Sequence, residues 1–233
     1  MNKTVTSIEE AVSDIHDGAV VLIGGFGGSG NPYNLIDALV RQGAKNLTIV
    51  CNDWTQWAPL LENKQVKKLI AGFTNHPFRP EVAEITERAY ETGELELETA
   101  PHGTLSERMR CGKAGIPAFY VGTGVGTVVE SGKEKRVFDG REYILEHAIK
   151  GDFSLVKGYK ADRWGNVVCR LAAGNRNIDM AGAARVTIVE VEEIVNAGEL
   201  DPERIDIPGI FIDRVVKAKR VWRWLAGHET AGR

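Results

Sequence analysis

The sequence contains few cysteines and no long apolar run. Its three cysteines, Cys51, Cys111 and Cys169, are odd in number and form no C-x-x-C pair. This argues against a disulfide framework and against a structural zinc site. No stretch approaches the roughly 20 apolar residues of a membrane span, and the first residues lack the apolar core of a secretory signal. We therefore expect a cytoplasmic protein with no membrane segment and no bound metal.

An excess of charge of one sign is also missing. The net charge is −3 over 233 residues, so the whole chain has no attraction to nucleic acid or to an anionic membrane. Basic residues in the tail 217–233 are interleaved with Trp222 and Trp224. That pattern is compatible with nucleic-acid contact, but a terminal helix docked on the body or on a partner is the simpler interpretation. We predict a single domain over residues 1–216, followed by this tail.

Short apolar runs alternate with helical patterns through the first half of the chain. Strands are predicted at 19–23, 47–51, 66–73 and 95–98, and helices begin near Ser7, at Pro32, at Pro80 and at Thr104. Ser7 to Glu10 and Thr104 to Glu107 have the spacing of capping boxes, and Gly43 and Gly112 are candidate helix ends. This order predicts an α/β fold with an open, mostly parallel sheet and helices on both of its faces.

The second half is richer in strands. A glycine-rich segment at 115–132 precedes a hairpin at 136–144 with Asp139-Gly140 at its turn. Further strands are predicted at 153–157, 167–171 and 185–191, with an edge strand over 209–216.

The stretch that follows the first predicted strand is the strongest local signal. Five glycines occur within the seven residues from Gly24 to Gly30, and Asn31 and Pro32 then suit the N-cap and first position of a helix. Exposed N–H groups and the helix dipole favour an anion at such a place. The absence of side chains lets a ligand lie against the backbone.

This loop by itself leaves several functions open. Gly25 to Gly30 matches G-x-G-x-x-G, and Asp53 lies at the end of the next strand, as in a dinucleotide site. An NAD-dependent oxidoreductase is therefore one interpretation. A tight structural turn without a ligand is another.

The surroundings of the loop are more specific. The pattern Asp17-Gly18-x(5)-Gly24-Gly25-Phe26-x(3)-Gly30-x-Pro32 resembles the signature of the A (alpha) subunit of class I CoA-transferases, the 3-oxoacid CoA-transferases. The resemblance runs from about residue 5 to 216, through 43–50, 93–96, 101–108, 115–120, 123–127, 162–166, 198–202 and 208–209. The stretches 162–166 and 198–202 look most like the 3-oxoadipate enzymes. The fold that the resemblance implies is the CoA-transferase, NagB/RpiA-like one.

The resemblance also implies a reaction. CoA would move from an acyl-CoA, such as succinyl-CoA, to a 3-oxoacid of the 3-oxoadipate or acetoacetate type, by a ping-pong mechanism through a glutamate. In the family this glutamate lies on the B (beta) subunit in a Ser-Glu-Asn-Gly motif, which this sequence lacks. The chain is therefore expected to carry no catalytic residue and to work in an A2B2 heterotetramer. Coenzyme A would be a substrate, and no cofactor is expected.

The matched motifs imply a set of residues that bind substrate or CoA: Gly24, Gly25, Phe26, Gly27, Gly30, Pro32, Asn52, Asp53, His102 and Gly103. Two of them depart from the family pattern. Asp53 replaces a second asparagine and cannot donate a hydrogen bond when ionised. His102 replaces a glutamine; it can still donate, and in its protonated form it would favour a carboxylate. These departures leave one more alternative, a CoA-binding chain without a catalytic role.

Overall fold

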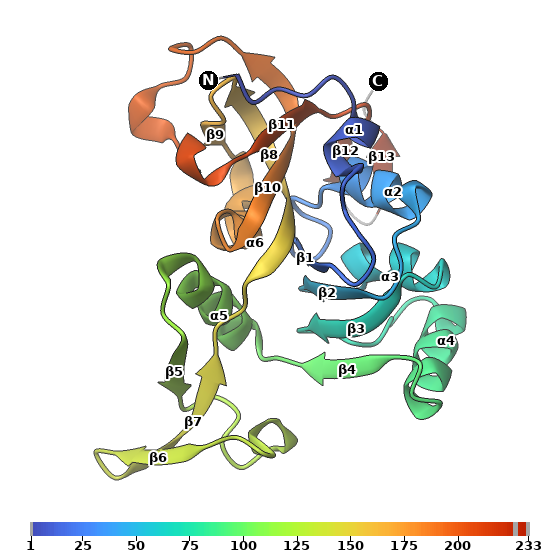
Figure 1. The fold of residues 1–233 in the computed structure, drawn as a ribbon, viewed down its shortest axis with the longest axis vertical. Helices are drawn as coiled ribbons and strands as arrows, with labels where there is room; N and C mark the ends of the chain where they lie inside the picture. The colour runs from blue at the N-terminus through green and yellow to red at the C-terminus, as the bar shows by residue number, and fades with distance from the viewer. Residues whose placement is uncertain (1, 226–227, 232–233) are drawn as a thin grey trace.

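The main sheet of the protein is open and almost entirely parallel (Figure 1). The computed structural model describes residues 2–225 and 228–231. Along the sheet the strands are β11 (Arg214–Lys217), β10 (Ala184–Val195), β8 (Gly151–Asp162), β1 (Val20–Ile23), β2 (Leu47–Cys51), β3 (Val66–Ala71) and β4 (Glu96–Thr99). The short β9 (Val167–Val168) pairs antiparallel with β8. The predicted fold class is confirmed.

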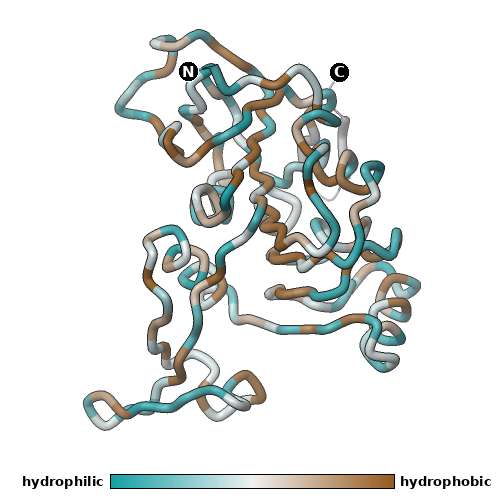
Figure 2. The backbone as a smooth tube through the Cα atoms, in the orientation of Figure 1, coloured by the Kyte–Doolittle hydropathy of each residue, from teal (hydrophilic) through white to brown (hydrophobic). Residues whose placement is uncertain are grey.

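Helices cover both faces because alternate residues of each central strand point to opposite sides. Val21 and Ile23 belong to the core beneath α1 (Ile8–Val12), α2 (Tyr33–Gln42), α3 (Trp54–Glu62) and α4 (Pro80–Glu91). Leu22 belongs to the other core, beneath α5 (His102–Ala114) and α6 (Asn175–Met180). Figure 2 shows the hydrophobic residues concentrated along the central strands.

Several helix boundaries differ from the prediction. Helix α2 begins at Tyr33 with Pro32 as its N-cap, so Asn31 does not cap it; the Asn31 amide instead donates to Thr55 Oγ1 at 2.8 Å. Helix α5 begins at His102, so Thr104 lies inside the helix and the predicted capping box is wrong. The helix also passes Gly112 and ends at Gly115, whose φ of +76° suits a glycine C-cap.

Helix α3 has no counterpart in the sequence prediction. Asp53 and Gln56 form a capping box that begins it, and Pro59 lies within it. An internal proline and the scarcity of charged residues hid the helical pattern of this segment.

A second, three-stranded antiparallel sheet lies between α5 and β8 along the chain, and Figure 1 shows it projecting from the main body. Its order is β5 (Ala118–Val121), β7 (Arg141–His147) and β6 (Lys135–Phe138). Asp139 and Gly140 both have positive φ, 48° and 74°, which confirms the predicted Asp-Gly hairpin turn. Short 3₁₀ helices occupy Val128–Glu130, Leu171–Gly174, Pro202–Arg204 and Gly209–Phe211.

The longest strands exceed their predicted lengths, and the secondary structure of the tail differs from the predicted one. Strands β8 and β10 each span 12 residues, whereas the predicted strand at 167–171 is only two residues long. The predicted terminal helix is wrong: β12 (Trp222–Leu225) and β13 (His228–Ala231) form an antiparallel pair. No helix in the described part of the chain is long and apolar enough to cross a membrane.

Candidate functional site

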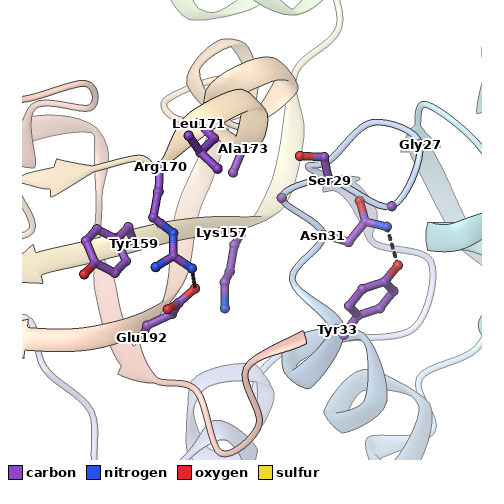
Figure 3. Close-up of a pocket in the computed structure, with 13 residues that line it drawn as sticks. Gly27, Ser29, Asn31, Tyr33, Lys157, Tyr159, Arg170, Leu171, Ala173 and Glu192 are labelled. Carbon is purple, nitrogen blue, oxygen red and sulfur yellow. Dashed lines mark hydrogen bonds and ion pairs between the residues drawn. The ribbon is translucent and has the colours of Figure 1, made fainter. Parts of the chain in front are cut away.

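A cavity of about 580 Å³ lies where the strand order of the main sheet reverses. Strand β1 pairs with β2 on one side and with β8 on the other, and open α/β sheets bind ligands in the crevice at such a point. The cavity is lined by Gly27, Gly28, Ser29, Gly30, Asn31, Tyr33, Lys157, Gly158, Tyr159, Arg170, Leu171, Ala173 and Glu192. Figure 3 shows Tyr159, Arg170 and Glu192 on one side, Asn31 and Tyr33 on the other, and Lys157 between them.

Two ion pairs lie beside this cavity. One links β8 to β10, and the other links the segment that follows β9 to β10. Lys157 Nζ lies 3.1 Å from Glu190 Oε1, and Arg170 Nη2 lies 3.1 Å from Glu192 Oε1. Glu190 is fully buried and also accepts the backbone N–H of Leu35, in the first turn of α2, at 3.0 Å. The predicted site residues do not include these four. The sequence signal that could have identified Lys157, Glu190 and Glu192 is a charged residue inside an otherwise apolar strand.

The glycine loop forms one wall of the cavity. Phe26 and Ser29 exchange backbone hydrogen bonds across its tip, and Gly27 and Gly30 both have positive φ, +56° and +72°. A side chain at Gly30 would place its Cβ 2.6 Å from the carbonyl oxygen of Ala173. Of the predicted site residues, Gly27 and Gly30 are the two that line the cavity.

Gly24, Gly25 and Pro32 are buried and lie beneath the loop, not on the cavity wall. A Cβ on Gly24 would collide with the Asn177 side-chain oxygen, and one on Gly25 would collide with that of Asn31. Asn177 in turn accepts the backbone N–H of Lys157 at 2.9 Å. Because Gly24 and Gly25 have no side chains, they leave room for the side-chain amides of Asn177 and Asn31, which join the loop to neighbouring segments.

Asp53 is buried and serves as an anchor for the loop. Its carboxylate accepts the backbone N–H groups of Gly27 at 2.7 Å and of Thr55 at 3.0 Å, and the Asn52 amide at 2.7 Å. Asn52 is fully buried, and its Oδ1 has no hydrogen-bond partner among the described residues.

His102 and Phe26 form a second cluster, outside the cavity lining. The imidazole of His102 lies 5.3 Å from the Phe26 ring and 5.0 Å from the Phe73 ring. Arg176 Nη2 donates to the His102 carbonyl oxygen at 3.0 Å. Burial lowers the pKa of His102, Arg176 lowers it further, and Asp53 acts in the opposite direction. Gly103, the second residue of α5, is exposed, with open space around its Cα.

The described residues include no group of three or more His, Cys, Asp or Glu side chains that could hold a metal ion.

The comparisons with known proteins give the family of the chain. The sequence model of the coenzyme A transferase family matches residues 5–218, and the chain belongs to this family. The resemblance inferred from the motifs is confirmed. Relatives named as parts of CoA-transferases show that the chain is part of an enzyme that transfers coenzyme A.

Two curated relatives are similar over nearly their whole length. The chain is 46% identical over 224 residues to the A subunit of succinyl-CoA:3-ketoacid coenzyme A transferase from Helicobacter pylori (strain J99), covering 94% of each chain. It is 46% identical over 220 residues to the A subunit of 3-oxoadipate CoA-transferase from Acinetobacter baylyi, covering 93% of this chain and 95% of that one. The solved structure of glutaconate coenzyme A-transferase from Acidaminococcus fermentans shares the fold, with a TM-score of 0.81 at 24% identity, over 92% of this chain and 75% of that one.

Proposed function

We propose that this chain is the A subunit of a 3-oxoacid CoA-transferase. It would move CoA from an acyl-CoA, with succinyl-CoA as the donor, to a 3-oxoacid of the acetoacetate or 3-oxoadipate type. The observation that carries this proposal is similarity over nine-tenths of the chain to relatives named for these two reactions. The cavity beside the glycine loop, at the reversal point of the sheet, supports it.

The proposed mechanism is ping-pong and covalent. A glutamate carboxylate that belongs to the B subunit first attacks the thioester, giving an acyl-glutamyl anhydride and CoA thiolate. The thiolate then attacks the glutamyl carbonyl, which releases the first acid and leaves a glutamyl-CoA thioester. The second acid attacks that thioester, which releases CoA thiolate and gives the anhydride of the second acid with the glutamate. The thiolate then attacks the acyl carbonyl of this anhydride, which forms the new acyl-CoA and frees the glutamate. Coenzyme A is thus a substrate, and we propose no other cofactor.

The engagement of the carboxylates near the cavity supports a glutamate from the partner. Carboxylates near the cavity in the described part of the chain are engaged: Glu190 and Glu192 in ion pairs, and Asp53 in hydrogen bonds from Gly27 and Thr55. The sequence also has no Ser-Glu-Asn-Gly motif. The site would therefore be completed by a B subunit, in an A2B2 assembly.

The contribution of this chain would be to position substrate and stabilise charge. The cavity wall formed by Gly27 to Gly30 would receive the pantetheine arm and the acyl group, because the loop presents backbone without bulky side chains. The first N–H groups of α5, at His102 and Gly103, have no capping side chain and would stabilise developing negative charge. Asn52 and Asp53 would act indirectly, by holding the loop.

Co-expression with a B subunit containing Ser-Glu-Asn-Gly tests the proposal. Succinyl-CoA plus acetoacetate or 3-oxoadipate should give the new acyl-CoA with the pair and none with this chain alone. Intact-mass spectrometry after incubation with acyl-CoA alone should show a CoA adduct on the B subunit. Full activity of this chain alone, or a CoA adduct on it, would contradict the proposal.

The dinucleotide interpretation is weakened by the engagement of Asp53. In a dinucleotide site the acid at the end of the second strand binds the ribose, but here it caps α3 and holds Gly27. A fluorescence titration with NADH is the direct measurement, and saturable micromolar binding would favour the oxidoreductase.

A further inference from the structure

The three-stranded antiparallel sheet that projects from the main body has two unpaired edges (Figure 1). Its central strand is β7, so β5 and β6 each pair with another strand on one side only. The backbone groups of Ala118–Val121 and Lys135–Phe138 that point away from β7 have no hydrogen-bond partner among the residues that the structure describes. An edge of this kind is a template on which another strand can pair.

The two edges differ in charge. Strand β6 contains Lys135 and Arg136, which are both exposed, and charged side chains protect an edge strand from pairing with another chain. Strand β5, over Ala118–Val121, contains no charged residue and is partly exposed along its whole length. Pro117 before it and Gly122 after it limit the length over which pairing can extend. The edge that accepts a partner strand is therefore β5.

One face of the projecting sheet carries aromatic rings up to this edge. The ring centroids of Tyr120 and Phe138 are 5.3 Å apart, and those of Phe138 and Tyr143 are 5.5 Å apart. Phe138 is 41% exposed, so the rings do not cover one another fully. Tyrosine, phenylalanine and arginine are enriched where proteins meet.

The charges beside β5 are balanced. The Tyr120 hydroxyl donates to Glu134, and the guanidinium carbon of Arg136 lies 5.2 Å from the centre of the Tyr120 ring. Arg136 also lies 3.7 Å from Glu134, so the two charges offset each other. A second copy of this face would therefore meet no excess charge of its own sign.

This balance matters most when a strand pairs with its own copy. A two-fold axis brings identical residues close together, so a charged strand would repel itself. Pairing through β6 would set Lys135 and Arg136 against the same residues of the second copy, whereas pairing through β5 brings together uncharged residues.

The pleat of the sheet restricts how two β5 strands can pair. Residues directly opposite each other in an antiparallel ladder point to the same face, so the two-fold axis must pass a residue and not the gap between two residues. The overlap of the two strands is greatest when that residue is Phe119 or Tyr120. In either arrangement the aromatic faces of the two copies become continuous.

We propose that β5 pairs antiparallel with β5 of a second copy of this chain, which joins the two projecting sheets into one. The contact lies between two A chains, and it rests on the proposed function in that it supplies the A–A contact of the proposed A2B2 assembly. The residues that line the cavity beside the glycine loop come from other segments, so the contact leaves the proposed A–B site open.

Charge reversal at one residue tests the pairing. In complexes co-expressed with the B subunit and measured by light scattering after size exclusion, Tyr120→Lys alone and Tyr120→Glu alone should each halve the mass of the wild-type assembly, because like charges face each other. A mixture in which the two A chains carry different affinity tags and are purified through both should recover the full mass. Val137→Lys, at a 61% exposed position of β6, is the control and should not change the mass.

Three results of this experiment would overturn the inference. They are a wild-type complex that contains a single A chain, full-mass assemblies with both single variants, and a mixture that stays at half the mass. The mixture separates lost pairing from damage to the fold, because only restored attraction between Lys and Glu can recover the assembly.

Cross-linking identifies the chain that lies against β5. In the co-expressed complex, a short bismaleimide should join two A chains through Phe119→Cys or Tyr120→Cys, and mass spectrometry of the denatured product identifies the pair. Val137→Cys should give no A–A product, and the unaltered chain, with its own three cysteines, gives the background. An A–B product from both β5 variants, or no product from either, would overturn the inference.

The same preparations separate this inference from the proposed function. The half-mass complex with Tyr120→Lys should keep the wild-type kcat/KM for CoA transfer, because its A–B site is unchanged. A wild-type complex that forms the A–A cross-link but transfers no CoA would count against the proposed reaction alone. A wild-type complex that transfers CoA, in which neither β5 cysteine joins two A chains, would count against the pairing alone.

Discussion

The carboxylate of Asp53 accepts the backbone N–H of Gly27 at 2.7 Å, and this bond fastens the loop after β1 to the first turn of α3. The two residues are 26 positions apart, and each belongs to the carboxyl end of a different strand. One side chain thus begins a helix and also sets the shape of the cavity wall.

Asp53→Asn should lower the free energy of unfolding by about 1–3 kcal/mol. Both carboxylate oxygens accept hydrogen bonds, from Gly27 and Asn52 on one and from Thr55 on the other. An amide would turn its NH₂ group toward one of these donors. Urea unfolding measures the loss, and Asp139→Asn in the exposed hairpin turn is the matched control. Equal stability of the two variants would contradict the anchoring role.

The ion pair between Lys157 and Glu190 should respond strongly to loss of one partner. Glu190→Gln leaves the Lys157 ammonium nearly buried without a counter-charge, and we expect a loss of about 3 kcal/mol. Lys160 and Glu193 form the control pair, three residues further along the same two strands but partly exposed. Glu193→Gln should cost less than about 1 kcal/mol. Similar chemical denaturation curves for both variants would show that burial does not distinguish the pairs.

The two cavity-lining glycines should differ in their tolerance of alanine. Gly27 has positive φ but open space around it, so Gly27→Ala should cost about 1–2 kcal/mol from backbone strain. Gly30 has positive φ and a carbonyl oxygen 2.6 Å from the added Cβ, so Gly30→Ala should cost clearly more. Thermal unfolding of both variants checks the order. The reverse order would mean that the loop relaxes around Gly30.

Stability should fall as the pH is lowered through the histidine range. The pKa values of His102 and His76 are below the ordinary 6.5 in the folded protein, in both cases first because of burial. The unfolded chain therefore binds more protons below that pH, and the stabilisation present above it is lost as the pH falls toward the folded-state values. Urea unfolding between about pH 7.5 and about pH 5.5 should show this slope.

His102→Gln should reduce that slope, because it removes one of the two groups. His76→Gln, which removes the other group, should reduce the slope as well. A slope that is the same in all three proteins would exclude a contribution from His102.

Most of the fold followed from local patterns. The prediction for β2 matched the observed Leu47–Cys51, and the Asp139-Gly140 turn was placed correctly. These segments carry their own signals: an uninterrupted apolar run and a turn that needs two positive φ values. Helix α3 was missed because Pro59 lies inside its helical pattern. The tail was assigned the wrong structure because its basic and aromatic residues are compatible with a docked helix as well as with the observed hairpin.

The site was only partly accessible to sequence reasoning. The glycine loop was recognised, but Lys157, Tyr159 and Arg170 were not, although they line the same cavity. They lie about 130 residues beyond the loop along the chain, and only the pairing of β1 with β8 brings the two segments together.

By itself, the sequence determined the order of strands and helices, the glycine loop and the family, because these depend on residue type and spacing along the chain. The tertiary structure decided that Asp53 anchors Gly27, that Lys157 faces Glu190, and that His102 is seated over Gly72. These contacts join segments whose separation and orientation depend on strand register and on helix packing against the sheet. No local sequence pattern contains that geometry. It forms only when the chain folds and the hydrophobic cores on both faces of the sheet are buried.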